Sequence, residues 1–307
     1  MKAGSNLEKV LQAGHFAVTA ELGPPRGTDT GIVEKKTEKL RGAVDAVNIT
    51  DNQSAMVHMS SIACAALLVK KGVEPVVQMT CRDRNRIALQ SDILGASALG
   101  VKNILCISGD HQSLGDQPGA KKVYDIDSTQ LVALAKRLRD EKRFLASDEE
   151  VCGDVPLFIG AAANPFAIPY ELRAQLLAKK VSAGADFVQT QCVFEVSMFA
   201  DWMSKVRSLG VHSKCHILAG IIPLKSFRMA RDMVENVPGI VIPDSILRRL
   251  EAAPKEKAAV EGIRICCEII QQVKEIEGVA GIHIMAIEWE HRIREIVSQA
   301  GLLPRPL

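Results

Sequence analysis

The segment Val18–Gly27 (VTAELGPPRG) places a carboxylic acid where it could do chemistry. An apolar run ends on Glu21, and the Gly-Pro-Pro that follows cannot continue a central strand. A carboxylate at the end of a buried strand is costly unless something uses it, because desolvation disfavours its charge. The position therefore predicts either a proton-transfer role or a structural ion pair, for which Arg26 and Arg82 are candidate partners.

Other apolar runs also lead into polar residues. The polar groups that follow them are Thr50-Asp51-Asn52, Gln78 to Asp83, Ser108-Gly109-Asp110-His111, Asn164, Gln189-Thr190-Gln191 and Glu288. These groups are rich in amides, hydroxyls and carboxylates and poor in fixed positive charge, which suits a large neutral heterocycle better than a sugar diphosphate. Structural alternatives stay open: Asp110 can be a turn residue after Gly109, and Gln191 can simply satisfy backbone groups.

The apolar runs themselves predict the elements that carry these residues. They are short and β-branched, and they cover 16–22, 44–50, 73–80, 102–109, 156–163, 187–194, 215–222 and 280–287. Several are apolar on both faces, as strands of a covered parallel sheet must be. Most of their starts lie 28 to 31 residues apart, the length of one βα unit, with longer gaps of 54 and 65 residues before the fifth and eighth runs. Eight such units predict an α/β protein of the (β/α)₈ TIM-barrel class.

An open, doubly wound sheet is the rival architecture. It usually carries a G-x-G-x-x-G turn after its first strand, and the sequence has none there. We therefore predict a single barrel domain over residues 1–307, with extra helical segments before strands five and eight. In such barrels the site lies at the C-terminal ends of the strands. The long Gly/Pro-rich loop 109–119 belongs to that rim, and Asp127 with Gln130 predicts a capping box on the helix that follows it.

Composition excludes several functional classes. The formal net charge is +2 and aromatic residues make up 4% of the chain, so neither nucleic acid nor an anionic membrane is an expected partner. No segment approaches the roughly 18–20 apolar residues of a membrane span, and the first residues do not read as a secretory signal, so we expect a cytoplasmic protein. The eight cysteines form no C-x-x-C and the histidines lack ligand spacing, so we expect no metal or iron–sulfur site. His283 is expected to be a hydrogen-bonded core histidine.

Six segments carry a resemblance to a known family. They are AELGPPRG, MTCRDRNRIALQSDILGASALGVKNILCISGDH, YDIDSTQL, KKVSAGADFVQTQ, LAGIIPL and HIMAIEWE. In this order, from about residue 16 to 292, they resemble the methylenetetrahydrofolate reductase family, and among its members the compact bacterial enzymes of the acetogen branch. The resemblance implies a flavin-bearing (β/α)₈ barrel that reduces 5,10-methylenetetrahydrofolate to 5-methyltetrahydrofolate.

The resemblance also assigns roles to residues. It implies that Glu21 is the general acid that helps to open the bridging five-membered ring of the folate. Asp110 matches the aspartate near the flavin pyrimidine edge and the bound folate, where it counts as catalytic and as a contact of both ligands. Gln191 matches the glutamine that hydrogen-bonds the pterin. Thr50, Gly109, Tyr124 and Lys180 fall at or beside flavin-contact positions, with Lys180 as the partner of a phosphate.

Some positions depart from the family pattern. Asn164, Ile168 and Ser108 stand where an aromatic residue, a histidine and an arginine are common around the flavin ribityl and phosphates, and Gln78 stands where a histidine is common. These departures predict a weaker hold on the adenylate half of FAD, so FMN is an alternative cofactor.

The electron source is open for a similar reason. The substrate glutamine and the ring that stacks on nicotinamide are replaced by Met229 and Met233. Electrons then come from NAD(P)H directly or through a partner subunit that bears iron–sulfur or flavin centres, and we expect the protein to be an oligomer.

Two functions of other classes stay open. A flavin-free pterin-binding barrel that transfers a methyl group from methyltetrahydrofolate would share the polar barrel mouth. A non-catalytic subunit of a larger complex would share the fold without the chemistry. A flavin spectrum separates the first from a reductase, and the effect of Glu21→Gln on turnover separates the second.

Overall fold

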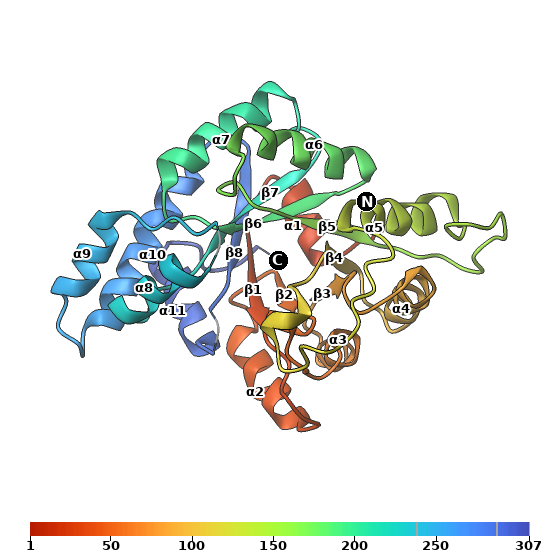
Figure 1. Cartoon of the computed structure of the whole chain (residues 1–307), viewed down its shortest axis with the longest axis horizontal. Helices are drawn as coiled ribbons and strands as arrows, with labels where there is room; N and C mark the ends of the chain where they lie inside the picture. The colour runs from red at the N-terminus through yellow and green to blue at the C-terminus, as the bar shows by residue number, and fades with distance from the viewer. Residues whose placement is uncertain (238, 287, 307) are drawn as a thin grey trace.

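In the computed structural model, which describes residues 1–237, 239–286 and 288–306, eight parallel strands close into a barrel in sequence order (Figure 1). The strands are β1 Ala17–Leu22, β2 Ala46–Ile49, β3 Pro75–Thr80, β4 Asn103–Ile107, β5 Phe158–Ala163, β6 Phe187–Cys192, β7 His216–Ile221 and β8 Val279–Ile284. The predicted (β/α)₈ barrel is confirmed. Seven strands lie inside their predicted runs and β8 starts one residue earlier, while Ile287, at the end of the eighth run, lies outside the described residues.

Helices surround the barrel (Figure 1). They are α1 Asn6–Gln12, α2 Thr30–Leu40, α3 Ser61–Lys70, α4 Arg86–Ala98, α5 Ser128–Lys136, α6 Arg173–Ala183, α7 Val196–Ser208, α8 Phe227–Asn236, α9 Asp244–Ala252, α10 Ala258–Lys274 and α11 Ile293–Gln299, with short turns η1 Gln53–Ala55, η2 Gln112–Leu114, η3 Arg137–Glu141, η4 Tyr170–Leu172 and η5 Glu290–Arg292. The predicted capping box at α5 is confirmed, because Asp127 and Gln130 each accept from the other's backbone N–H. The longest connections hold η2, α5 and η3 before β5, and α8, α9 and α10 before β8.

Two cores hold the barrel together. The larger lies between the strands and the helices that surround them. The smaller fills the N-terminal half of the barrel, where Leu7, Val10 and Leu11 of α1 pack against inward-facing strand residues. Phe158 and Phe187 stack there with ring centroids 5.1 Å apart. The barrel is thus plugged with apolar side chains at one end, and its other end is left for polar groups.

Carboxylates lock the plugged end. Asp45, whose side chain is fully buried, pairs with Arg305 at 2.6 Å and accepts the Val18 N–H at 2.7 Å. Asp186 pairs with Arg139 at 2.6 Å and accepts the Ile159 N–H at 2.8 Å. In each case an arginine neutralises the charge and a backbone donor completes the shell, as a buried carboxylate requires.

The N-terminal segment is held by a third carboxylate. Glu8 accepts the backbone N–H groups of Ala3 at 2.9 Å and Gly4 at 2.7 Å, and that of Lys2 as well. Burial raises the pKa of Glu8, but these donors outweigh it, so that the pKa lies below its ordinary value. Glu8 is therefore held as a carboxylate.

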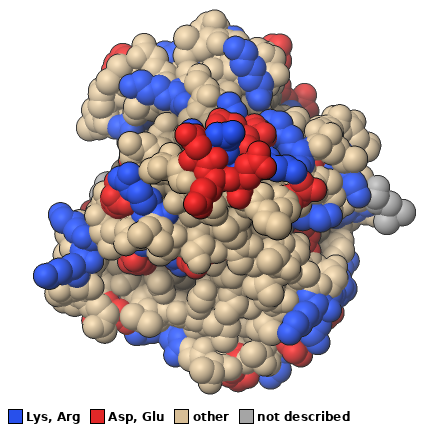
Figure 2. Space-filling view, turned by 90° about the vertical axis from the view of Figure 1, so that its right-hand side faces the viewer, with Lys and Arg blue, Asp and Glu red and all other residues tan. Residues whose placement is uncertain are grey.

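The surface mixes charges of both signs. On the face in Figure 2, acidic side chains gather among lysines and arginines. The segment that follows α5 extends to this side of the molecule in Figure 1, and ion pairs such as Lys142 with Asp154 tie it together. Among the described residues, no helix combines the length and the apolar character that a bilayer crossing needs.

Candidate active site

The C-terminal end of the barrel opens into a cleft of about 1100 Å³. This volume matches the upper range of small-molecule and cofactor sites. The structure brings together nine of the residues singled out from sequence, which line the cleft: Glu21, Thr50, Gln78, Ser108, Gly109, Asp110, Asn164, Lys180 and Gln191. They come from seven parts of the chain, so the cleft is a product of the closed barrel.

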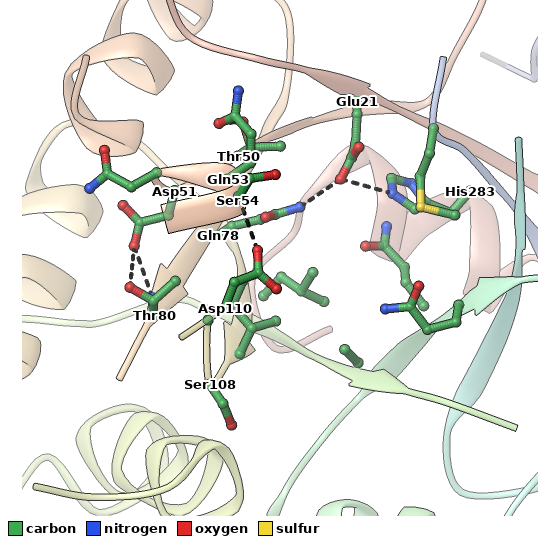
Figure 3. Close-up of a pocket in the computed structure, with 18 of the residues that line it drawn as sticks. Glu21, Thr50, Asp51, Gln53, Ser54, Gln78, Thr80, Ser108, Asp110 and His283 are labelled. Atoms are coloured by element: carbon green, nitrogen blue, oxygen red, sulfur yellow. Dashed lines mark hydrogen bonds and ion pairs between the residues drawn. The ribbon is translucent and has the colours of Figure 1, made fainter. Parts of the chain in front are cut away.

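Glu21 lies near the floor of the cleft on β1, with its side chain 18% exposed. Gln78 donates a hydrogen bond from Nε2 to Glu21 Oε1 at 3.0 Å, and His283 Nε2 lies 3.7 Å from the same oxygen (Figure 3). The alternative of an arginine partner is wrong. Arg26 pairs with Asp116, and Arg82 pairs with Asp83 at 2.7 Å.

A chain of buried polar side chains runs from Glu21 across the barrel. His283 Nδ1 lies 2.9 Å from Thr19 Oγ1, which accepts from Gln189 Nε2 at 3.0 Å. Gln189 exchanges two further hydrogen bonds with Asn48, at 2.6 and 3.0 Å. All four are at most 3% exposed. His283 is the hydrogen-bonded core histidine that the sequence predicts, but its contact with Glu21 was not foreseen. The sequence does contain a signal for these contacts, because polar residues such as Asn48 stand in the middle of otherwise apolar strands.

Asp110 lies on the exposed rim and accepts a hydrogen bond from the turn that follows β2. Its Oδ2 accepts the backbone N–H of Ser54 at 3.0 Å, and it follows Gly109, whose φ is +84° (Figure 3). Asn52, Ser54 and Ala55 also have positive φ, which is strained for residues with a side chain. Asp110 therefore fixes a strained turn of the rim, and the role that the resemblance gives it stays a prediction.

Arg82 ties the rim turns together from below. It is 3% exposed, and its guanidinium donates to the Asp110 carbonyl at 3.1 Å and to the Asn52 carbonyl at 3.2 Å. The hydrogen bond to Asp83 raises the pKa of Arg82 further. Above it, a Cβ at Gly115 would lie 1.8 Å from the Ala55 carbonyl oxygen, so the two turns touch through their backbones. The rim on the β2–β4 side is a connected unit.

The opposite wall carries a cation. Lys180 on α6 donates from Nζ to the Ala162 carbonyl at 2.7 Å, and burial lowers its pKa. Among the described residues it has no carboxylate within ion-pair distance. Ser128 and Thr129, at the N-terminus of α5, line the same cleft. Helix N-terminal N–H groups, hydroxyls and an ammonium form a donor set that suits a phosphate.

The remaining predicted residues lie elsewhere or act differently. Tyr124 is not among the residues that line the cleft, and its hydroxyl donates to the Gly109 carbonyl at 3.4 Å. Gln191 is exposed in the cleft, and it is the neighbouring Thr190 hydroxyl that accepts the Gly220 N–H at 2.9 Å. Tyr124 therefore lies behind the cleft wall. Thr190, rather than Gln191, satisfies the backbone group, so the structural alternative for Gln191 is not supported.

Three positions at which the sequence departs from the family pattern lie outside the cleft lining. Met233 of α8 is 8% exposed and packs in the core, and Met229 packs against the same core. Ile168 is 77% exposed, near the start of α6. Neither methionine presents a ring-stacking surface to the cleft.

The fold and the cleft define a (β/α)₈-barrel protein with an enzyme-like ligand site, in which a carboxyl group lies beside an amide and an imidazole. A match to a family model identifies which family of barrel proteins this is. The chain belongs to the methylenetetrahydrofolate reductase family, whose model matches residues 6–301.

Curated relatives carry the same family name at modest identity. A probable methylenetetrahydrofolate reductase (NADPH) of Caenorhabditis elegans is 27% identical over 307 residues, which is 96% of this chain and 44% of that protein. The 5,10-methylenetetrahydrofolate reductase of Salmonella typhimurium is 24% identical over 241 residues, 76% of this chain and 73% of that one. The chain thus spans less than half of the nematode relative.

Solved structures share the fold. An uncharacterized protein from Clostridium thermocellum, described as binding two copies of 5-methyl-5,6,7,8-tetrahydrofolic acid, has a TM-score of 0.63 at 15% identity, covering 95% of this chain and 98% of that one. Oxaloacetate acetylhydrolase also matches, with a TM-score of 0.50 at 10% identity over 92% of this chain and 81% of that one. Because proteins of such different function share the barrel, function has to be argued from the cleft.

Proposed function

We propose that this chain catalyses the flavin-dependent reduction of 5,10-methylenetetrahydrofolate to 5-methyltetrahydrofolate. The observation that carries the proposal is Glu21, a partly buried carboxyl group at the C-terminal end of β1 whose contacts are the neutral amide of Gln78 and the imidazole of His283. A carboxyl group that no arginine neutralises is free to take up and release a proton. Family membership supplies the substrate class.

Glu21 acts as the general acid. It donates a proton to the folate nitrogen that leaves when the five-membered ring opens, and the remaining cation is then ready to accept a hydride. Gln78 holds one carboxyl oxygen, so the acid has a fixed orientation before the substrate arrives. Gln191 and Asp110 face the same cleft and are the proposed partners of the pterin.

The wall around Lys180 fits a flavin. In the part of the chain that the structure describes, the only hydrogen-bond partner of the half-buried Lys180 ammonium is the Ala162 carbonyl, and Ser128 and Thr129 at the N-terminus of α5 border the same space. We infer that these groups hold the cofactor phosphate, with Thr50, Gln78, Ser108, Gly109 and Asn164 along the rest of the flavin. A reduced flavin, when bound, supplies the hydride. Tyr124 supports the Gly109 turn from outside the cleft.

The identity of the flavin and the source of its electrons are separate questions. Asn164 is uncharged and Ile168 lies outside the cleft lining, so neither position supplies the contact that the family pattern has there for FAD, and FMN fits as well. The position of Met233 in the core removes a stacking platform for nicotinamide. We infer that electrons reach the flavin through a redox partner protein, with direct reduction by NAD(P)H as the alternative.

All eight cysteines are free thiols in the structure. Free thiols persist in reducing compartments, which supports the proposed cytoplasmic location.

Two measurements test the function. Mass spectrometry of the extracted cofactor distinguishes FAD, FMN and no flavin. Anaerobic mixing of the chemically reduced protein with 5,10-methylenetetrahydrofolate should restore the absorbance of oxidised flavin and yield 5-methyltetrahydrofolate. A colourless protein that takes up no flavin but transfers a methyl group from methyltetrahydrofolate would establish the methyltransferase alternative instead. Rapid bleaching by NADH alone would remove the need for a partner protein.

A further inference from the structure

We propose that a relay of buried hydrogen bonds, from Asn48 and Gln189 through Thr19 to His283, holds His283 in its neutral Nε2–H form so that Glu21 can carry a transferable proton. The proposal rests on the proposed role of Glu21 as an acid. It assigns positioning roles to Thr19, Gln189 and Asn48, which lie two, three and four contacts away from Glu21 along the relay.

The amide pair sets the direction of the relay. Asn48 Nδ2 donates to Gln189 Oε1 at 2.6 Å, and Gln189 Nε2 donates to Asn48 Oδ1 at 3.0 Å. One N–H of Gln189 is used in this exchange. The other points to Thr19 Oγ1 at 3.0 Å, and an amide nitrogen can only donate, so the Thr19 oxygen is the acceptor.

The Thr19 hydroxyl then determines which nitrogen of the His283 imidazole accepts a hydrogen bond. Its single hydroxyl proton can go to His283 Nδ1 at 2.9 Å or to the Ile282 carbonyl at 3.4 Å. The shorter contact is the stronger hydrogen bond. With Nδ1 accepting, a neutral imidazole must carry its proton on Nε2, which is the nitrogen that faces Glu21.

This form of His283 matters for the chemistry of Glu21. An imidazolium at 3.7 Å would stabilise the carboxylate and oppose the protonated acid. To protonate Nδ1, the Thr19 hydroxyl would have to turn its proton from Nδ1 at 2.9 Å to the Ile282 carbonyl at 3.4 Å, which is the weaker hydrogen bond. The relay thus keeps a positive charge away from the acid.

The relay also selects which carboxyl oxygen reacts. Gln78 and His283 both approach Oε1 (Figure 3). In the part of the chain that the structure describes, Oε2 has no protein hydrogen-bond partner. With the Gln78 N–H donating to Oε1 and the His283 Nε2 nearest to the same oxygen, the acid carries its proton on Oε2, which is left to the ligand in the cleft.

The tautomer is the direct test, and it needs no turnover. In protein with isotope-labelled histidine, NMR reports which ring nitrogen is protonated, and His283→Gln identifies the signal. We expect the Nε2–H form at neutral pH in the wild type, and loss of this fixed form in Thr19→Val. An Nδ1–H form or an imidazolium in the wild type would overturn the proposal even if the enzyme is active.

Kinetics test the consequence. The rate at which 5,10-methylenetetrahydrofolate reoxidises the reduced flavoprotein should fall about tenfold in Thr19→Val, the size of one hydrogen bond, with the substrate dissociation constant unchanged. Thr19→Ser keeps the hydroxyl and should recover most of the rate. Thr37→Val is the matched control, because Thr37 is as buried but bonds only to Val33 of its own helix.

The outcomes separate the two proposals. Equal rates in Thr19→Val and wild type, or no recovery in Thr19→Ser, would refute the relay while leaving Glu21 as the acid. Wild-type protein that binds flavin but is not reoxidised by the folate would refute the proposed function, and the tautomer measurement would still decide the state of His283.

Discussion

The two ends of the barrel treat their carboxylates differently. At the plugged end, Asp45 and Asp186 each pair with an arginine at 2.6 Å and also accept a backbone N–H. At the open end, Gln78 and His283 are the only hydrogen-bond or ion-pair contacts of the Glu21 carboxyl group among the residues that the structure describes. A guanidinium compensates the charge of a buried carboxylate, whereas Glu21 has an amide and an imidazole beside it instead. The arginine partners therefore distinguish the two carboxylates of the plugged end from Glu21, the proposed acid, although all three are buried or nearly so.

The largest effect on the rate of folate reduction is expected from substitution of Glu21, the proposed acid. Glu21→Gln keeps the size of the side chain but removes the transferable proton, so the rate of folate reduction should fall about 10²- to 10⁴-fold. Flavin content and the midpoint of thermal unfolding should stay close to wild type. Stopped-flow reoxidation and calorimetry measure the two quantities. Full activity in this variant would show that Glu21 is not the acid, even though it has no arginine partner.

The opposite pattern is expected at the plugged end. Arg305→Met leaves the charge of Asp45 buried without its partner, which should cost about 3–5 kcal/mol of unfolding free energy. Activity per folded molecule should not change, because the pair lies at the far end of the barrel from the cleft. Urea unfolding followed by circular dichroism gives the stability, and a stability equal to wild type would contradict the structural role.

Lys180 tests the cleft as a site for an anion. Lys180→Met should weaken flavin binding by about 10- to 100-fold, the range of a hydrogen bond to a charged group. Fluorescence titration of the apoprotein with FMN and FAD measures the affinities. Lys102→Met is the control, since the Lys102 ammonium also donates to a carbonyl, that of Gly4, but lies at the plugged end. An equal loss in both variants would argue against a phosphate contact at Lys180.

The smallest effect concerns acid stability. The pKa of Glu8 is lowered in the folded protein, so its contribution is present above the ordinary value of 4.5 and is lost as the pH falls through the folded value. Glu8→Gln should reduce stability by about 1 kcal/mol at neutral pH and by less in acid. Urea unfolding at several pH values gives the difference. Glu149→Gln, at an exposed position, should show no such pH-dependent difference.

The barrel could be predicted from the sequence because its signals are local. The apolar runs and their spacing of one βα unit gave strand positions to within a few residues, and the end of each strand then named residues of the rim. The capping box at Asp127 was equally readable, because it depends on residues three apart.

The contacts across the barrel could not be predicted in the same way. Asn48 and Gln189 are 141 residues apart, and their hydrogen bonds depend on the stagger of the closed sheet. The same holds for Arg26, which pairs with Asp116 rather than with Glu21, and for Tyr124, which lies behind the cleft wall. Spacing along the chain places a residue at a strand end, but its partner is set by side-chain direction and by the geometry of loops.

The backbone contact between Gly115 and Ala55 joins a turn that lines the cleft to one that lies outside it. The Ala55 carbonyl occupies the space that any larger residue at position 115 would need. The turn η1 therefore packs directly against the backbone at the end of η2. A residue larger than glycine at position 115 would therefore have to push η1 aside, and Gln53 and Ser54 of that turn line the cleft, so a change outside the cleft would reshape its mouth.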